Sequence, residues 1–293
     1  MIIDEFQKGL LFMDLGKPTH ISLSTYDIDM TLFMTEFYEP DIEYDIWYWL
    51  SNHTMKLPEN VHLHQLNNNH CKFWYIQTPT TVRLIITSCN ITYSMTHGCL
   101  QSYYSLTCPR SLETLSGSNC TSFNDSTMYK SRETTAKSIG KDYTGSWHRD
   151  NRIPKSCKSF FQIFDVTLDA NVLKTLQSRV LYNIPNKYNG IENWYMQQSE
   201  LIIDANNLNL AYLDNIKRTL FIRTELPPSV NTIICYFRTD YTSPRLTVQK
   251  EPYKAVYHYK LYMSGNTLLL SSNNFSFHHK QNYELGVLLP INH

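Results

Sequence analysis

Alanine and glycine are scarce in this sequence, and neither sign of charge is in excess. The 293 residues include 5 Ala and 9 Gly beside 24 Asn, 21 Tyr and 27 Thr, and 26 basic side chains balance 26 acidic ones. This balance excludes a basic arm that condenses nucleic acid and an acidic solvating tail. Because alanine is the best helix former, whereas Tyr, Thr, Ile, Val and Phe suit pleated strands, the composition favours a β-dominated fold.

Long apolar runs and paired cysteine motifs are also missing. No apolar run reaches the length of about 18 residues that a membrane span needs, so the sequence predicts no transmembrane helix. The seven cysteines show no C-x-x-C spacing, which argues against a zinc site and against a closed disulfide framework. Free thiols are therefore expected, although five cysteines lie within residues 71–120 and leave one local bridge open.

Apolar residues alternate with polar ones in many short segments. The strongest strand pattern covers residues 71–96, where Pro79 separates two strands and Val82, Leu84 and Ile86 share one face. Residues 18–36 indicate a strand with a one-residue slip, and residues 169–183 form the one convincing helix pattern. Further strands are predicted at 199–204, 208–213, 217–226, 231–242, 245–251, 255–265 and 266–277.

Short strands punctuated by turn residues are typical of a β-sandwich or a jelly roll. The sequence therefore predicts an all-β fold, an antiparallel β-sandwich or jelly roll with long loops and one or two short helices. Ser, Thr, Asn, Gly and charged residues dominate 97–158, which predicts a long polar surface loop within a single domain over residues 1–293. A linker between two domains is the alternative, and no internal repeat is visible.

His62, His64 and His70 are the candidate metal ligands. His62 and His64 share one face of a strand, so both imidazoles could reach one ion, and His70 lies close by in the sequence. Residues 65–70 contain no carboxylate, however, and flanking glycines are absent. The sequence therefore predicts no metal site and no other cofactor.

No catalytic motif stands out either. His148-Arg149-Asp150 matches a kinase triplet, but the Asn expected five positions later is Lys155, and no phosphate-binding glycine loop occurs. His258, between Tyr257 and Tyr259, and the pair His278-His279 could stack on bases or sugars, or could be ordinary core and surface residues. We expect no catalytic residue and no enzymatic activity.

Four segments resemble strands of parvovirus capsid proteins, especially the small capsid proteins of densoviruses. Thr219–Ser229 ends in a proline-bearing turn and is followed by the amphipathic segment Lys254–Met263, like the closing pair of jelly-roll strands. Thr19–Thr25 is similar to the opening strand, and Thr81–Ile86 to the strand after the first crossover. Unlike many members of that family, the sequence has no glycine-rich run and no His-Asp dipeptide.

The resemblance implies a structural coat protein that self-assembles into an icosahedral shell around single-stranded DNA. Its partners would be further copies of itself, single-stranded DNA and a host receptor. It would be located in the virion, and in the host cell during assembly. Two alternatives remain open at this point. One is a β-sandwich protein that binds carbohydrate or a receptor, and the other is a β-barrel enzyme that binds a metal through its histidines.

Overall fold

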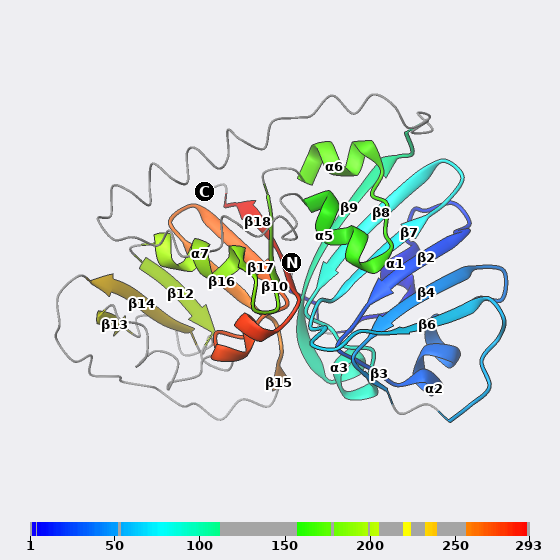
Figure 1. Ribbon diagram of the computed structural model, residues 1–293, viewed down its shortest axis with the longest axis horizontal. Helices are drawn as coiled ribbons and strands as arrows, with labels where there is room; N and C mark the ends of the chain where they lie inside the picture. The colour runs from blue at the N-terminus through cyan, green and yellow to red at the C-terminus, as the bar shows by residue number, and fades with distance from the viewer. Residues whose placement is uncertain are drawn as a thin grey trace.

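The computed structural model describes residues 2–3, 5–51, 54–111, 157–176, 179–198, 200–204, 219–223, 232–238 and 256–291. Within these residues the chain forms two eight-stranded sheets and a two-stranded ribbon. The first sheet, made almost entirely by the N-terminal part of the chain, lies on the right of Figure 1, and the second lies on the left.

The first sheet mixes parallel and antiparallel pairs. Strands β2, β4 and β6 run parallel to one another, whereas β2, β7, β8 and β9 form antiparallel pairs. The short strand β15 (Val256–Tyr257) comes from the C-terminal part of the chain and pairs parallel with β9. In spatial order the other strands are β1 (Ile2–Ile3), β9 (Cys99–Pro109), β8 (Thr81–Thr87), β7 (Phe73–Gln77), β2 (His20–Ser24), β4 (Glu43–Tyr48) and β6 (Val61–Gln65).

Both faces are buried at the centre of the first sheet, in β7 and β8, which explains the continuous apolar runs of these two strands. Phe73 and Tyr75 pack into one hydrophobic cluster, whereas Trp74 and Ile76, which alternate with them on β7, pack into another. Successive strand residues point to opposite faces, so a sheet that is covered on both sides needs apolar residues at every position. The clean polar alternation of a sandwich is therefore absent from β7.

The second sheet is antiparallel in all of its described pairs. Its three central strands, β16, β17 and β18, follow one another along the chain like β7, β8 and β9 of the first sheet. In spatial order its strands are β11 (Tyr188–Asn189), β10 (Val180–Ile184), β18 (Glu284–Pro290), β17 (Thr267–Ser271), β16 (Leu261–Ser264), β12 (Glu200–Asp204), β14 (Thr232–Arg238) and β13 (Thr219–Arg223). The separate ribbon pairs β3 (Asp27–Ile28) with β5 (Leu50–Ser51) in parallel.

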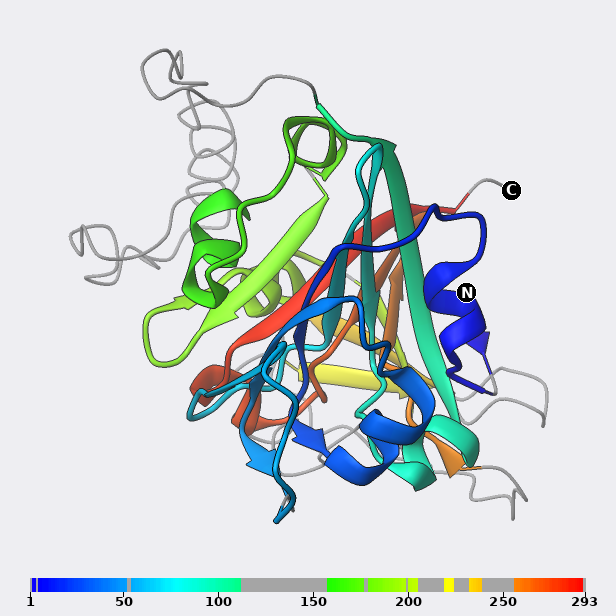
Figure 2. The same cartoon turned by 90° about the vertical axis from the view of Figure 1, so that its right-hand side faces the viewer.

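Short helices cover the sheets. The described helices are α1 (Lys8–Phe12), α2 (Met30–Leu32), the π-helix η1 (Phe33–Phe37), α3 (Tyr93–His97), α5 (Cys157–Phe161), the 3-10 helix η3 (Gln162–Phe164), α6 (Ala170–Leu176), α7 (Gly190–Gln197) and the 3-10 helix η5 (Phe277–Gln281). Figure 2 shows α1, in blue, on the opposite side of the first sheet from the green helices α5 and α6.

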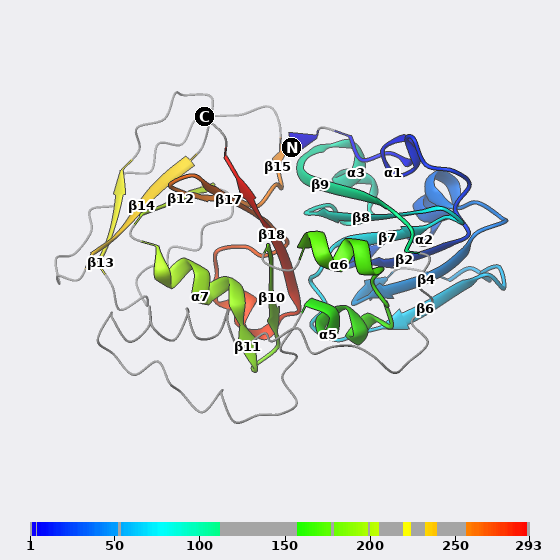
Figure 3. The same ribbon diagram turned by 90° about the horizontal axis from the view of Figure 1, so that it is seen from above.

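One hydrophobic cluster joins the two sheets. It combines Phe73 and Leu84 of the first sheet with Leu285 of the second, and Phe160 of α5 packs into it. Figure 3 shows α5 and α6 beside β10, at the junction of the two sheets. The two halves of the chain therefore share a core. The prediction of one domain over residues 1–293 stays a prediction.

The predicted all-β jelly roll is wrong. The first sheet contains parallel pairs, and helices pack on both of its faces. The error has a physical cause, because helices this short owe their stability to tertiary packing and not to intrinsic propensity. The segment from Asp29 to Phe37 shows this: Asp29 accepts hydrogen bonds from the Thr31 and Leu32 amides, and Phe33 and Phe37 are fully buried. The slipped strand predicted for residues 18–36 thus ends in a helix.

Two further predictions need correction. The polar loop predicted for 97–158 begins with β9, which pairs with β8 from Thr81 to Thr87, whereas residues 112–156 lie outside the described residues. The helix predicted for 169–183 ends at Leu176 as α6, and Val180 begins β10. The two strands separated by Pro79 are confirmed, as is the shared face of Val82, Leu84 and Ile86.

None of the helices in the described part of the chain has the length and hydropathy that a membrane crossing requires. The cysteines with described side chains are free thiols, namely Cys71, Cys89, Cys99, Cys108 and Cys157.

Candidate active site

Two H-x-K tripeptides stand at equivalent places in the two sheets. His70-Cys71-Lys72 leads into β7, and His258-Tyr259-Lys260 leads into β16. Both lysines are completely buried, which is rare for an ammonium group unless it serves a site or an ion pair. In each half, three consecutive strands then form an antiparallel meander.

The same hydrogen bonds recur in both halves. The second strand of each meander returns to the lysine carbonyl, and it is followed directly by a serine whose amide and hydroxyl both contact the third strand. Thr87 N donates to Lys72 O (3.1 Å) in the first half, as Ser271 N donates to Lys260 O (3.0 Å) in the second. Ser88 N donates to Ser102 O (3.1 Å), as Ser272 N donates to Leu285 O (2.9 Å). In the reverse direction, Ser102 N donates to Ser88 Oγ (2.9 Å), as Leu285 N donates to Ser272 Oγ (3.0 Å).

We therefore divide the site in two. The first half-site is His70, Lys72, Ser88, Asn90 and Gln101, and the second half-site is His258, Lys260, Ser272, Asn274 and Glu284. Although no internal repeat is visible in the sequence, the backbone repeats one arrangement, with Ser-x-Asn after the second strand of each meander.

Backbone contacts bring the two halves together. The His70 amide donates to the Tyr283 carbonyl (3.0 Å), directly before β18, and the His258 amide donates to the Leu100 carbonyl of β9 (2.9 Å). Each tripeptide is thus fixed to the third strand of the other half. In Figure 1, β15, which leads to His258, lies at the lower edge of the molecule, as does α3.

The imidazoles are also oriented across the halves. His70 Nδ1 contacts Glu284 Oε2 (3.0 Å), and His258 Nδ1 contacts Gln101 Oε1 (3.0 Å). The Gln101 amide orientation follows from its other bonds, since Nε2 donates to the Met95 carbonyl (2.9 Å). Both acceptors therefore require a proton on Nδ1, which leaves the lone pair of each histidine on Nε2.

Burial keeps both imidazoles neutral. It lowers the pKa of His70, against the opposing effect of the Glu284 carboxylate. It also lowers the pKa of His258 to about 2, helped by the charges of Lys260 and Lys72. Because residues of the first half-site act on His258 in this way, the two half-sites form one electrostatic unit.

The lysines and Glu284 give the site its charge. Burial lowers the pKa of Lys72 to about 8, although Glu284 opposes this shift. Lys72 Nζ donates to the His70 carbonyl (2.9 Å), and Lys260 Nζ donates to the His258 carbonyl (2.7 Å). Burial alone would raise the pKa of Glu284, but His70, Lys72 and the Ser272 hydroxyl together lower it. Glu284 is therefore a carboxylate at neutral pH.

Asn90 supplies a buried polar group that has no hydrogen-bond partner in the described part of the chain. Its side chain is 8% exposed, and its Oδ1 is buried without a hydrogen-bond partner among the described residues. Its counterpart Asn274 is exposed. A buried amide with an unused atom is costly unless a ligand or water satisfies it, so Asn90 is a candidate ligand-binding residue.

Aromatic rings border the first half-site. The Tyr26 ring meets the His70 ring edge-on, with centroids 5.2 Å apart, and Lys72 Nζ lies 5.7 Å from the Tyr26 centroid. Trp49 meets Tyr26 edge-on at 5.4 Å. Both rings are half-buried, so this border combines apolar surface with the Lys72 ammonium group over the Tyr26 ring.

The three candidate metal ligands do not meet. His62 contacts Glu43, and His64 Nε2 contacts Asp45 Oδ1 (2.8 Å), both between β6 and β4. His70 lies instead in the active site, beside Glu284. The described residues contain no group of three or more His, Cys, Asp or Glu side chains that could hold a metal ion.

The other sequence candidates are dispersed. His148, Arg149 and Asp150 lie outside the described residues, and His278 is exposed on η5. His258, which the sequence suggested as a stacking residue between two tyrosines, lies in the candidate site, where it contacts Gln101. The second lysine tripeptide was the signal that could have found the site, because H-x-K occurs before a strand in both halves.

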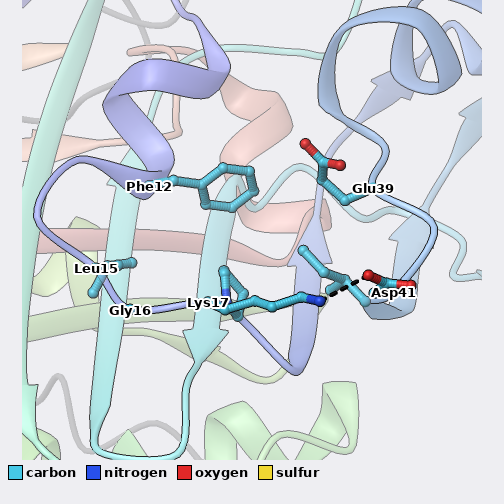
Figure 4. A pocket seen from close by; sticks show the side chains of 8 residues that line it. Phe12, Leu15, Gly16, Lys17, Glu39 and Asp41 are labelled. Atoms are coloured by element: carbon cyan, nitrogen blue, oxygen red, sulfur yellow. Dashed lines mark hydrogen bonds and ion pairs between the residues drawn. The ribbon is translucent and has the colours of Figure 1, made fainter.

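A small open pocket lies elsewhere (Figure 4). It measures about 220 Å³, has an apolar side formed by Phe12 and Ile42, and carries an ion pair between Lys17 and Asp41 (2.7 Å). Its lining residues precede β2 and β4, whereas Tyr26 of the active-site border follows β2. The pocket is therefore at the other end of the first sheet from the half-sites.

Comparisons with solved structures address the fold. A histidine-to-arginine mutant of yeast tyrosyl-DNA phosphodiesterase 1 matches with a TM-score of 0.51 and 11% identity, over 98% of this chain and 89% of that chain. The fold resembles that of this enzyme. A second mutant of the yeast tyrosyl-DNA phosphodiesterase matches at 0.47 and 13%, over 99% and 87% of the two chains. Polyphosphate kinase from Porphyromonas gingivalis matches at 0.39 and 10%, over 99% and 44%. No family model and no curated protein matches the sequence.

The likeness overturns the predicted capsid protein. The strand patterns that resembled densovirus capsid proteins belong to two sheets in a phosphodiesterase-like arrangement, not to a jelly roll. The predictions of a structural, non-enzymatic shell subunit and of a large homo-oligomer with single-stranded DNA and a receptor depended on that jelly roll, and a fold shared with an enzyme contradicts them. The β-sandwich and β-barrel alternatives required all-β folds and fall with it. The predicted virion location is untested and stays a prediction.

Proposed function

We propose that this chain is a phosphodiester hydrolase in which His70 is the nucleophile and His258 the proton donor. The observation that carries the proposal is the pair of imidazoles held at Nδ1 by acceptors from opposite halves, with two buried lysines whose charges act on both rings. Oriented neutral imidazoles can attack phosphorus or transfer protons, and buried ammonium groups stabilise negative charge on phosphoryl oxygens.

The unequal acceptors support the choice of nucleophile. When Nε2 of His70 bonds to phosphorus, its ring becomes cationic, and the Glu284 carboxylate stabilises that charge. The amide oxygen of Gln101 carries no net charge, so His258 gives up a proton more readily. Burial is the main cause of the low pKa of His258, and the lysine charges add to it; an anionic diester offsets those charges and so favours a proton on Nε2 as the substrate binds.

The reaction then has two steps. In the first, His70 Nε2 bonds to phosphorus, the bond to the leaving oxygen breaks, and that oxygen takes the proton from His258. In the second, water bonds to phosphorus and gives a proton to His258, while the bond from phosphorus to His70 breaks. Lys72, Lys260 and the Asn90 amide would hold the other phosphoryl oxygens throughout.

The protein with the similar fold is named for its action on tyrosyl-DNA, which suggests a diester between a phenolic oxygen and a nucleotide as the first substrate to test. An aromatic leaving group would also suit the border formed by Tyr26 and Trp49.

The test uses the 4-nitrophenyl ester of thymidine phosphate, labelled with ³²P. Wild-type protein is expected to release 4-nitrophenolate, and His70→Asn to lose roughly 10⁴-fold or more of kcat/KM without forming labelled protein. Because 4-nitrophenolate departs without a proton, His258→Asn is expected to complete the first step, stall at the second and retain acid-labile label. His62→Asn, an exposed histidine outside the site, is the control.

The outcomes separate the possibilities. Label on His70→Asn and none on His258→Asn would reverse the two roles. A wild-type protein that cleaves no nucleotide or bis-aryl diester and is never labelled would refute the proposal.

A further inference from the structure

Asp27 lies between Tyr26 and the segment that carries Asn90, and hydrogen bonds to its carbonyl fix its position. It follows Tyr26, whose ring touches His70 and lies below Lys72. Its carbonyl accepts hydrogen bonds from Thr25 Oγ1 (2.9 Å) and from the amide of Ile91, the neighbour of Asn90 (3.2 Å). Strand β3 thus clamps this acidic residue against the segment that carries Asn90.

The Asp27 carboxylate acts on the phosphate-binding charges. Asp27 is half-buried, and the neighbouring Ile28 amide lowers the pKa of its carboxyl group. Burial and neighbouring Asp29 raise its pKa, whereas Lys72 lowers it, and Asp27 in turn raises the pKa of Lys72. A carboxylate that interacts with a lysine of the site is unexpected where only anion binding is required.

A count of charges shows what this carboxylate does. Lys72 and Lys260 supply two positive charges, and Glu284 and Asp27 supply two negative ones, while both imidazoles are neutral. A phosphodiester brings one negative charge, whereas a phosphomonoester brings nearly two at pH 7, because its second pKa lies near 6. The site therefore tolerates the first ligand better than the second.

We infer that Asp27 is a specificity-determining residue that repels phosphomonoester dianions, so that diesters bind and the hydrolysed product leaves. The inference rests on the proposed function, because hydrolysis of a diester is what converts a monoanion into a dianion. Water adds an oxygen to phosphorus as the leaving oxygen departs as alcohol, and the product then loses a second proton to solvent. The extra charge arises on the phosphoryl group after the bond has broken, in the half-site that Asp27 adjoins.

The test compares two inhibitors of the same shape and different charge. Phenyl phosphate is a dianion and phenyl sulfate a monoanion at pH 7.5. Removing one carboxylate charge several ångströms away should strengthen binding of the dianion more, by roughly five- to tenfold relative to the monoanion. Asp27→Asn is therefore expected to raise the ratio of the phenyl sulfate inhibition constant to the phenyl phosphate inhibition constant by that factor, with diester hydrolysis as the assay.

Asp29→Asn is the matched control. Asp29 caps α2 through the Thr31 and Leu32 amides, and asparagine is an equally good cap. Its inhibition ratio should change less than twofold. Asp27→Ser gives the same loss of charge if asparagine disturbs β3.

An unchanged ratio in both Asp27 variants, with diester hydrolysis intact, would overturn this inference and leave the proposed function standing. If the wild-type protein does not hydrolyse diesters, and if the Asp27 variants also bind the two inhibitors with the same equilibrium constants as wild type, both the inference and the proposed function would be overturned.

Discussion

The first and second half-sites follow one backbone path but differ in the groups that face each other across it. Each places a histidine and a buried lysine before the meander and a serine after its second strand, and each orients the histidine of the other half. The acceptor is a carboxylate at Glu284 and an amide at Gln101. The buried Asn90 belongs to the first half and the exposed Asn274 to the second.

The comparison shows how one duplicated arrangement would give the two chemical roles that we propose. Equivalent main-chain contacts fix the positions of the imidazoles, so the two histidines differ chiefly in the charge of their acceptors. In the proposed mechanism, a single carboxylate makes His70 the better site for a cationic intermediate and leaves His258 the better acid. Since each acceptor comes from the opposite half, neither half can form a complete site by itself.

The largest effects are expected where the half-sites are alike. Replacing Lys72 or Lys260 by methionine should lower kcat/KM for a diester by roughly 10²- to 10³-fold in either case, because each removes a buried cation that stabilises phosphoryl oxygens. Steady-state kinetics on the 4-nitrophenyl ester measure this. Lys17→Met, in the pocket at the other end of the sheet, is the control and should keep its activity. A loss confined to one lysine would break the equivalence of the half-sites.

Exchanging the acceptors sharpens the comparison directly. Glu284→Gln removes the negative partner of His70 and should lower kcat/KM about 10²-fold, whereas Gln101→Glu should cost about tenfold, because a carboxylate makes His258 a weaker acid. The lifetime of the labelled intermediate, measured by rapid quench, should shorten in Glu284→Gln, because the cationic His70 ring loses its carboxylate partner. Equal losses in both variants, with unchanged lifetimes, would mean that the two acceptors serve only to position the rings.

Much of the scaffold could be predicted from the sequence, but its arrangement could not. The strands on either side of Pro79 and the common face of Val82, Leu84 and Ile86 are local patterns, and the structure has them. Parallel pairing of β2 with β4 is a long-range choice that alternation does not encode, and a β-rich composition conceals short helices such as α3 that packing stabilises.

Only the histidine and lysine residues of the candidate site could be recognised in the sequence. Three H-x-K tripeptides are visible in the sequence, and two of them, His70-Cys71-Lys72 and His258-Tyr259-Lys260, stand directly before an apolar strand, whereas His278-His279-Lys280 does not. Glu284 and Gln101 could not be recognised in it, because the β9 and β18 backbones bring them to the opposite histidines. The fixed tautomers, the low pKa of His258 and the unpaired Asn90 oxygen all depend on burial that arises only when both halves assemble.

A moderate effect is expected in the pH dependence of kcat/KM. Burial lowers the pKa of Lys72 to about 8, so its positive charge is lost as the pH rises through that value, and kcat/KM should fall about tenfold per unit above it. The Glu284 charge raises the pKa of Lys72, so Glu284→Gln should move this limb to lower pH. A pH profile of kcat/KM in both proteins measures the shift. If kcat/KM falls at the same pH in wild type and in Glu284→Gln, the Glu284 charge does not control the ionisation of Lys72.

The smallest effects belong to the serines, where the half-sites differ only in the charge of one hydrogen-bond acceptor. Ser88 Oγ donates to the neutral Gln101 Oε1 (2.8 Å), and Ser272 Oγ donates to the Glu284 carboxylate. Hydrogen bonds to charged groups contribute about 1.5–3 kcal/mol and neutral ones about 0.5–1.5 kcal/mol, so Ser272→Ala should destabilise the fold more than Ser88→Ala. Urea denaturation measures both free energies of unfolding, and kcat/KM should fall only a few-fold in each. A larger loss of stability in Ser88→Ala would show that the carboxylate is stabilised mainly by His70 and Lys72, and that the serines are equivalent supports of the third strand in each meander.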